Sequence, residues 1–177
     1  MAHSSAQPPL PVPEISDRLR AQFGEDVSEA LDRDGHAEVT VVPTRYREVV
    51  QTLRDDEDFA MDFLDFLTAV DHPERGELDV VTHLYSTVRN HHVRLKVRVP
   101  RDDPRCPTLS DLYPGANWHE RETWELFGIL FEGHPHLVKL VLPEPFEGHP
   151  LRKDFVLMSR EAKVWPGAVE GEEVEEE

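Results

Sequence analysis

Histidine and acidic side chains gather between residues 120 and 155, and they are the groups of this chain that could do chemistry. His134, His136 and His149 stand near Glu132 in this stretch. Imidazole nitrogens and carboxylate oxygens ligate zinc and iron, so the four residues could assemble a metal site. The alternative is that the two Gly-His-Pro units are turns, in which Gly takes a positive φ and the imidazole hydrogen-bonds the backbone. We favour the turns and keep the metal site as an alternative.

Other catalytic patterns fail on spacing. The pair His119-Glu120 resembles the start of a metalloprotease helix, but that motif needs a second His where this chain has Thr123. Glu120 and Glu122 are two apart and point to different sides of a helix, so we expect them to cap and form ion pairs. The chain has no Gly-rich phosphate loop and no Gly-x-Ser-x-Gly elbow. Its single cysteine, Cys106, excludes an internal disulfide and a cysteine-only iron–sulfur cluster. No catalytic residue is therefore predicted.

The charge of the chain limits its partners. Its 177 residues carry 36 Asp and Glu against 19 Lys and Arg, a formal net charge of −17. Such a chain repels phosphate backbones and anionic lipid headgroups, so nucleic acid is not expected as a partner. Charged residues or prolines interrupt every apolar run before it could span a bilayer, and the N-terminus does not resemble a secretory signal. Any association with a membrane is expected to go through a partner protein.

The first half of the chain alternates helical and strand patterns. Residues 1–13 are rich in Pro and are predicted to be a flexible lead-in. Apolar residues then recur four apart up to Phe23, which predicts a short helix closed by Gly24. Residues 36–42 alternate like a strand, with residues 27–31 as a hairpin partner. A second helix is expected to be capped by Thr44 and to bury Tyr46, Val49, Val50 and Leu53.

The middle of the chain predicts a sheet. Residues 63–70 are a dense apolar run whose second half we expect to be a strand, and residues 78–88 and 93–99 predict a hairpin. Arg94, Lys96 and Arg98 form a row that is either a solvated sheet face or a basic docking strip. The fold class is predicted to be α+β, a two-layer sandwich with a mixed, mostly antiparallel sheet, helices on one face and an extended C-terminal segment.

The chain divides into four predicted parts. The lead-in, residues 1–13, precedes an α+β domain at 14–115. A helix and an extended docking segment follow at 116–157, and residues 158–177 form an acidic tail predicted to be disordered. The helix is expected to cover residues 118–127, with Asn117 and Glu120 as a capping box and Gly128 just past its end. Arg121 could pair with Glu125 one turn on.

Large aromatic and basic residues also gather in this C-terminal half. That mixture suits a protein interface, and an ordinary core with a solvated rim is the alternative. The residues are Trp118, Trp124, Phe127, Phe131 and Phe146, with Arg121, Arg152 and Lys153.

Several motifs in this region resemble a known family. They are Glu-Arg-Glu at 120–122, Leu-Phe-Gly-Ile at 126–129, Phe-Glu-Gly-His-Pro at 131–135, and Gly-His-Pro-Leu-Arg-Lys-Asp-Phe at 148–155. In this order and spacing they resemble the 30-kDa subunit of respiratory complex I, and the resemblance extends over about residues 14–157. Glu125 stands where the family usually has Asp, which keeps the charge but lengthens the arm.

The resemblance implies a non-catalytic structural subunit in the peripheral arm of a proton-translocating NADH:quinone oxidoreductase. Such a chain binds no flavin, iron–sulfur cluster or quinone, and the FMN and Fe-S clusters belong to partner subunits. It docks to the D subunit, which helps form the quinone site, near the cluster-bearing subunits, on the cytoplasmic side of the bacterial inner membrane. Residues expected to form partner contacts or structural ion pairs are Glu120, Arg121, Glu122, Trp124, His134, His149, Arg152, Lys153 and Asp154.

Three other functions stay open at this point. The chain could be the equivalent subunit of a related membrane-bound hydrogenase or of another quinone reductase. It could also be a stand-alone metalloenzyme that uses His134, His136 and His149. The last alternative is a free-standing acidic adaptor.

Overall fold

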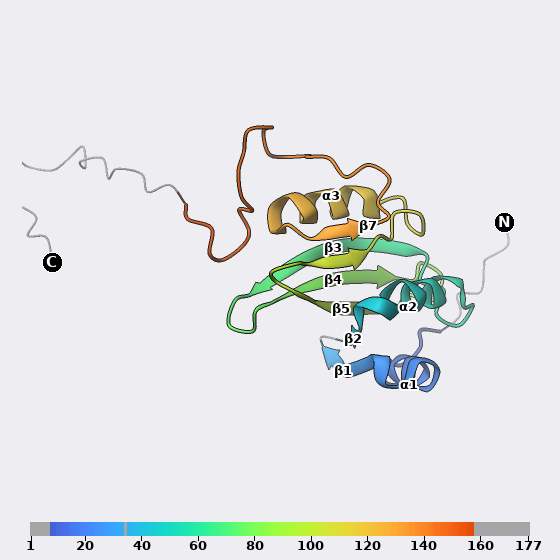
Figure 1. Ribbon diagram of the computed structural model, residues 1–177. Coiled ribbons are helices and arrows are strands. Elements are labelled where there is room, and N and C mark those ends of the chain that lie inside the picture. Colours follow the sequence, from blue (N-terminus) through green and yellow to red (C-terminus); the bar gives the residue numbers. More distant parts are fainter. Residues whose placement is uncertain (1–7, 34, 158–177) are drawn as a thin grey trace, which may run out of the picture.

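A five-stranded sheet forms the centre of the computed structural model, which describes residues 8–33 and 35–157 (Figure 1). The strand order is β1-β2-β5-β4-β3. Neighbouring strands pair antiparallel except β2 and β5, which are parallel, so the sheet is mixed. The strands are β1 (Val27–Arg33), β2 (His36–Val41), β3 (Phe63–His72), β4 (Glu77–Tyr85) and β5 (His92–Pro100).

Two helices cover one face of the sheet. They are α1 (Val12–Phe23), which a 3₁₀ turn (Gly24–Asp26) follows, and α2 (Pro43–Asp55). Alternate residues of β5 point at this face and are buried, as the sequence pattern predicts. The predicted apolar stripe of α2, Tyr46, Val49, Val50 and Leu53, is fully buried against it. At about 25 cal/mol per Å² of apolar surface, this shared core is the main source of stability.

The starts of both helices differ from the sequence prediction. Thr44 does not cap α2, because it lies inside the helix, which begins at Pro43 and follows Val42 without a side-chain cap. The first helix begins at Val12, so Pro13 lies inside its first turn. Proline is tolerated there because the first backbone N–H groups of a helix have no helical partner. The expected lead-in therefore overlaps the helix, and residues 1–7 lie outside the described part of the chain.

The strand predictions are confirmed and in one place extended. Residues 27–33 and 36–41 form the expected hairpin, and β4 and β5 form the other, although β4 ends at Tyr85 and not at residue 88 as predicted. The whole run from Phe63 to His72 is a strand, although only its second half was predicted to be one. Apolar density did not reveal this, because β3 alternates between the covered face and the open face and contains a bulge between Leu64 and Phe66.

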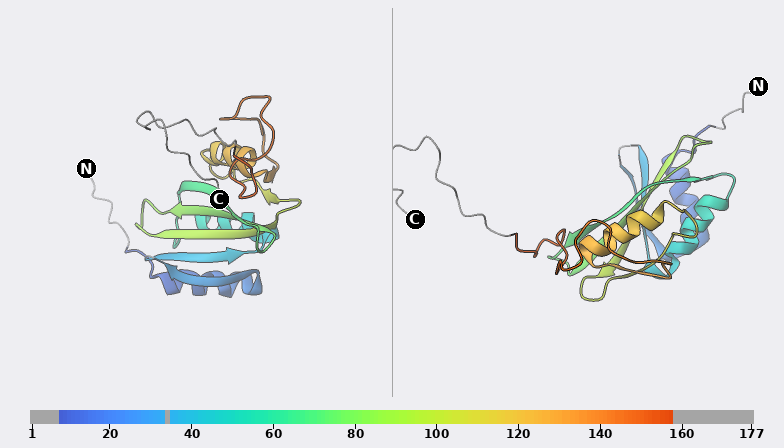
Figure 2. Two further views of the ribbon diagram at one scale, coloured as in Figure 1. Left: turned by 90° about the vertical axis from the view of Figure 1, so that its left-hand side faces the viewer. Right: turned by 90° about the horizontal axis from the view of Figure 1, so that it is seen from above.

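A third helix, α3 (Ala116–Phe127), packs along β3 (Figures 1 and 2). Short strands precede and follow it, β6 (Arg105–Pro107) and β7 (Leu130–Glu132), and pair in parallel. Residues 133–157 then form neither helix nor strand. The predicted two-layer α+β fold with an extended C-terminal segment is confirmed, and the acidic tail at 158–177 lies outside the described residues. Among the described residues, no helix combines the length and the hydrophobicity that a transmembrane span requires.

Candidate docking surface

Two glutamates on α3 are buried and bind different parts of the chain. Glu120 faces the core, where its carboxyl group binds the Thr108 hydroxyl and accepts a hydrogen bond of 2.6 Å from the Leu109 N–H. Burial raises its pKa to about 7, although both hydrogen bonds favour the ionised form. Glu120 is therefore not the capping-box residue that the sequence predicted. The helix begins at Ala116 without a side-chain cap, and Glu120 ties α3 to the loop after β6.

Glu125 instead holds the chain that follows the helix. Its carboxylate accepts hydrogen bonds from three successive backbone N–H groups, those of Leu140 and Val141 at 2.9 Å and Leu142 at 2.6 Å. Burial acts to raise the pKa of Glu125, but the three N–H groups outweigh it and hold the pKa below its usual value. An anion set against consecutive N–H groups fixes both the position and the direction of residues 140–142.

Arg121 binds the same segment one turn earlier on α3. Its guanidinium donates to the carbonyls of Val138 and Lys139 at 3.0 and 3.2 Å and lies over the ring of Trp118, 5.2 Å from the centroid. The spacing had suggested an ion pair between Arg121 and Glu125. Instead, each binds backbone groups of residues 138–142. The carbonyls and N–H groups of this irregular segment need partners that a neighbouring strand would supply in a sheet.

The two Gly-His-Pro units are turns, as favoured from the sequence. Gly133 and Gly148 have φ of 85° and 87°. The ring of His134 contacts the Asn117 carbonyl through Nε2 and accepts the His136 N–H at Nδ1. The ring of His149 contacts the Glu125 carbonyl at 2.9 Å. Backbone groups occupy both ring nitrogens of His134, and among the described residues His134, His136 and His149 do not lie close enough together to hold one metal ion.

Arg152 and Gly128 close the end of α3. Gly128 takes the predicted left-handed conformation with φ of 78°, and the Arg152 side chain donates a 2.6 Å hydrogen bond to the Phe127 carbonyl. The ring of His149 lies so close that a Cβ at position 128 would stand 2.6 Å from its Nε2 atom. Glycine is thus required twice, by the backbone conformation and by the close approach of His149.

The basic end of the segment is tied to the sheet. Buried Asp71 accepts two hydrogen bonds from Arg101, at 2.9 and 3.2 Å, and one from the Lys153 N–H at 2.8 Å. Arg101 also reaches Asp154 at 2.6 Å, so it bridges a buried and an exposed carboxylate. The Arg101 guanidinium and the Lys153 N–H lower the pKa of Asp71 against the opposing effect of burial, which is the largest single influence. Residues 152–154 are therefore fixed within this chain.

We call α3 together with residues 133–157 the docking surface. It is an ordered layer that leaves apolar side chains on the outside. Such side chains fixed in place on a defined backbone are suited to burial against another protein. The exposed apolar residues are Trp118, Val138, Leu140, Val141, Leu151, Val156 and Leu157.

The aromatic residues divide between the two roles considered from the sequence. Phe127 and Phe131 belong to the core, whereas Trp118 is 60% exposed. Trp124 is half-buried against the core, and Phe146 stacks on Phe155 with centroids 5.9 Å apart.

The predicted site residues have mixed positions. Glu120, Arg121, His134, His149, Arg152 and Asp154 all bind groups of this chain, Lys153 does so through its backbone, and Glu122 is exposed. Their contacts with a partner stay a prediction. Sequence reasoning left out Glu125, Asp71 and Arg101 as anchors. No sequence signal pointed to Glu125 as an anchor, because its partners are backbone N–H groups, which have no sequence signature.

Comparisons with known proteins point in one direction. Residues 39–161 match the family model described as the 30 Kd subunit of respiratory-chain NADH dehydrogenase. The C subunit of NADH-quinone oxidoreductase from Roseiflexus sp. (strain RS-1) is 42% identical over 148 residues, which is 83% of this chain and 85% of that protein.

Two solved structures are similar as well. One is from the membrane-bound sulfane sulfur reductase, an archaeal respiratory membrane complex, with a TM-score of 0.65 and 26% identity over 82% of this chain and 86% of that one. The other is a trypsin-resistant fragment of Nqo5, with a TM-score of 0.58 and 31% identity over 71% of this chain and 98% of that one.

Proposed function

The chain belongs to the 30-kDa subunit family of respiratory-chain NADH dehydrogenase, and on that premise we propose that it is a structural subunit of the peripheral arm of a proton-translocating NADH:quinone oxidoreductase. In this proposal the chain contributes binding surface and no reacting group. Electrons pass from NADH through FMN and Fe-S clusters held by partner subunits to quinone. The chain is held at the cytoplasmic side of the membrane through these partners.

The observation that supports this role is the construction of the docking surface. Glu125, Arg121 and Arg152 fix an irregular segment in one shape before any partner binds. A preformed surface loses less conformational entropy on association, so more of the binding energy is retained. The partner we propose for it is the D subunit, which helps form the quinone site, with the Fe-S subunits of the arm as neighbours.

Co-purification from native membranes tests membership in the complex. Mild solubilisation followed by capture of this chain is expected to recover the D subunit and the Fe-S subunits together with NADH:quinone oxidoreductase activity. Recovery of the chain alone, as a monodisperse monomer, would support the acidic adaptor instead and would contradict the proposal.

A single substitution tests the surface itself. Val141 is 65% exposed and its N–H is held by Glu125, so Val141→Glu places a charge on the docking surface without removing an anchor. The matched control is Val88→Glu, which changes a 48% exposed valine in the turn between β4 and β5. We expect Val141→Glu to lower the yield of assembled complex at least tenfold, since a charge desolvated in an interface costs more than about 1.4 kcal/mol. Equal yields of assembled complex from the two variants would show that the docking surface does not contact a partner.

A second candidate function has a specific observation in its favour. The sulfane sulfur reductase structure matches more of this chain than the Nqo5 fragment does. The same docking surface would then serve a related membrane complex, such as a hydrogenase or another quinone reductase, with a different electron donor. The identity of the electron-input module that co-purifies distinguishes the two, because only the NADH-linked complex brings a flavin subunit that oxidises NADH.

A further inference from the structure

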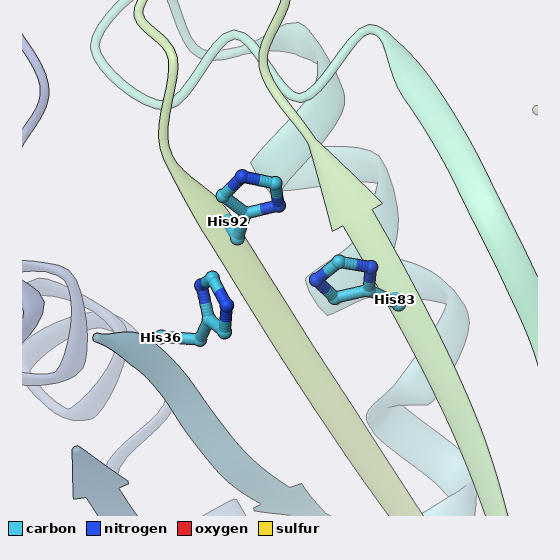
Figure 3. Close-up of side chains that lie close together, drawn as sticks. All are labelled: His36, His83 and His92. Atoms are coloured by element: carbon cyan, nitrogen blue, oxygen red, sulfur yellow. The ribbon is translucent and has the colours of Figure 1, made fainter. Parts of the chain in front are cut away.

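A cluster of three histidines lies on the face of the sheet opposite α1 and α2 (Figure 3). His36 begins β2, His92 begins β5, and His83 lies in β4. Because β2 pairs in parallel with β5, Ala37 stands level with Val93, which sets His36 beside His92. The antiparallel pairing of β4 with β5 brings His83 diagonally next to His92. Three adjacent strands thus each deliver one imidazole to the same place.

The spacing of the rings is close to that of a metal site. One nitrogen from each histidine lies within 4.8 Å of the other two, and the ring centroids are 4.6 to 5.7 Å apart. Three imidazoles on a tetrahedral zinc ion, with Zn–N bonds of 2.0–2.1 Å, have their nitrogens about 3.4 Å apart. The rings of His83 and His92 are nearly parallel, at 8°. A rotation of one of them about its Cβ–Cγ bond is therefore needed for both lone pairs to meet.

Each of the three rings has a buried nitrogen without a hydrogen-bond partner among the described residues. These atoms are Nδ1 of His36, Nε2 of His83 and Nδ1 of His92. A buried polar atom left unpaired is costly because it loses its hydrogen bonds to water, and native proteins seldom leave three together. A metal cation could satisfy all three nitrogens, because it accepts several lone pairs at once.

A carboxylate selects the nitrogen of His83 that faces the cluster. His83 is only 7% exposed, and its Nδ1 lies 2.9 Å from the Oδ2 atom of Asp65. In the neutral ring, a hydrogen bond from Nδ1–H to this carboxylate leaves the lone pair on Nε2. Metal-binding histidines are commonly oriented and made more basic by such a carboxylate.

Charges around the cluster nearly balance, so they do not oppose a cation. Arg94 and Lys96 lie on the same face, and both bind the buried carboxylate of Glu38, at 3.3 and 2.7 Å. Asp65 adds a further negative charge next to His83.

We propose that His36, His83 and His92 bind one divalent transition metal ion, with Zn²⁺ as the ion that three neutral imidazoles and a tetrahedral geometry suit. Asp65 is the positioning residue that holds His83. The three ligands leave a fourth coordination position for water or a side chain from another protein. The ion would pin the ends of β2, β4 and β5 together.

Metal titration of the full chain tests the proposal, using protein purified without a polyhistidine tag and stripped with a chelator. Calorimetry is expected to show one equivalent of Zn²⁺ bound, and the thermal unfolding midpoint is expected to rise with Zn²⁺. Co²⁺ is expected to give the visible spectrum of a tetrahedral site. Absence of stoichiometric binding in the unsubstituted chain would overturn the proposal and leave the proposed function untouched.

Substitutions locate the ion. His36→Gln and His92→Gln are each expected to weaken Zn²⁺ binding at least tenfold and to abolish the Co²⁺ spectrum, and Asp65→Asn to weaken it about tenfold. Both ligand histidines are half-buried, so circular dichroism of the metal-free variants checks that they fold. The control is His136→Gln, which changes an exposed histidine of the other candidate metal set and is expected to bind like the unsubstituted chain. If His136→Gln lost Zn²⁺ binding while His36→Gln and His92→Gln retained it, the proposal would be contradicted.

Discussion

The sheet and the docking surface are built on opposite principles. Strands β2 to β5 hold one another through backbone ladders and bury alternate side chains against α1 and α2. Residues 133–157 have no ladder; side chains of α3 bind their backbone groups one by one, and His149 of the segment contacts a backbone carbonyl of α3. The sheet spreads its stabilisation over many equivalent contacts, whereas the docking surface depends on a few anchors. We therefore expect single substitutions to act locally and strongly in the second region.

The largest effect is expected for Gly128→Ala. The substitution places a Cβ 2.6 Å from the His149 ring and forces a positive φ on alanine. Left-handed strain and overpacking together are expected to cost about 2–4 kcal/mol of unfolding free energy, measured by chemical denaturation. Limited proteolysis is expected to show the cleavage concentrated in residues 133–157.

The control for this substitution is Gly115→Ala. Position 115 precedes α3, has φ of −64°, and has no atom within 4 Å of the new Cβ. Little change in stability is expected there. If both variants lost the same stability, the close approach at Gly128 would not be the cause.

The second effect is a pH dependence that comes from Glu120. Its pKa is about 7 in the folded chain and near 4.5 unfolded, so the folded state binds the proton more tightly between these values. Raising the pH from 5 to 8 should therefore lower the unfolding free energy, on the order of 2–3 kcal/mol from this group. Charged or titratable groups close to it among the described residues are Asp111, Arg47, His134, Cys106 and Tyr46.

Glu120→Gln isolates that contribution. Denaturant unfolding at pH 5 and pH 8 is measured for both proteins, and the difference between them removes the titration of other groups. We expect the substituted chain to lose less stability over this range. If the unfolding free energy changed with pH equally in the two proteins, the pKa of Glu120 would be the same in the folded and the unfolded chain.

A smaller and more local effect is expected for Glu125→Gln. The amide keeps the shape but replaces one acceptor oxygen by a donor that opposes a backbone N–H. Hydrogen exchange of the amides of residues 140–142 is expected to speed up, by an amount equivalent to about 1.5 kcal/mol of local opening. Exchange in β4 and β5 should not change. The neighbouring exposed Glu122→Gln serves as control, and acceleration in both variants would argue against the anchor.

The smallest effect is expected for Asp154→Asn. The Asp154 side chain is 62% exposed, and Arg101 keeps its two hydrogen bonds to buried Asp71 without it. Exposed ion pairs contribute little because solvent screens them. The midpoint of chemical unfolding should stay nearly constant, and a clear loss would show that Asp154 belongs to the anchors.

Helices and strands could be predicted from the sequence because the hydrophobic patterns that indicate them are local. The stripe from Tyr46 to Leu53 and the alternation from Val93 to Val99 each predict an element and its buried face. Helix starts were less accurate, because proline at the first turn replaces a capping side chain in α1 and α2. The Gly-His-Pro turns were also predictable, since Gly133 and Gly148 need a positive φ that glycine supplies.

The anchors and the histidine cluster could not be predicted from the sequence. Glu125 is five residues from Glu120 on the same helix, and nothing in their identity reveals that one binds a loop and the other the backbone of residues 140–142. The parallel pairing of β2 with β5 brings together His36 and His92, which are separated by α2, β3 and β4 in the chain.

Fold class, family and the two Gly-His-Pro turns follow from periodicity and motifs that are visible along the chain. The roles of the charged residues depend on how the chain packs. Glu120 acquired a raised pKa through burial, whereas Glu125 acquired a lowered one through three N–H groups. The same side chain thus takes opposite electrostatic roles, since burial and hydrogen-bond partners are properties of the packed chain.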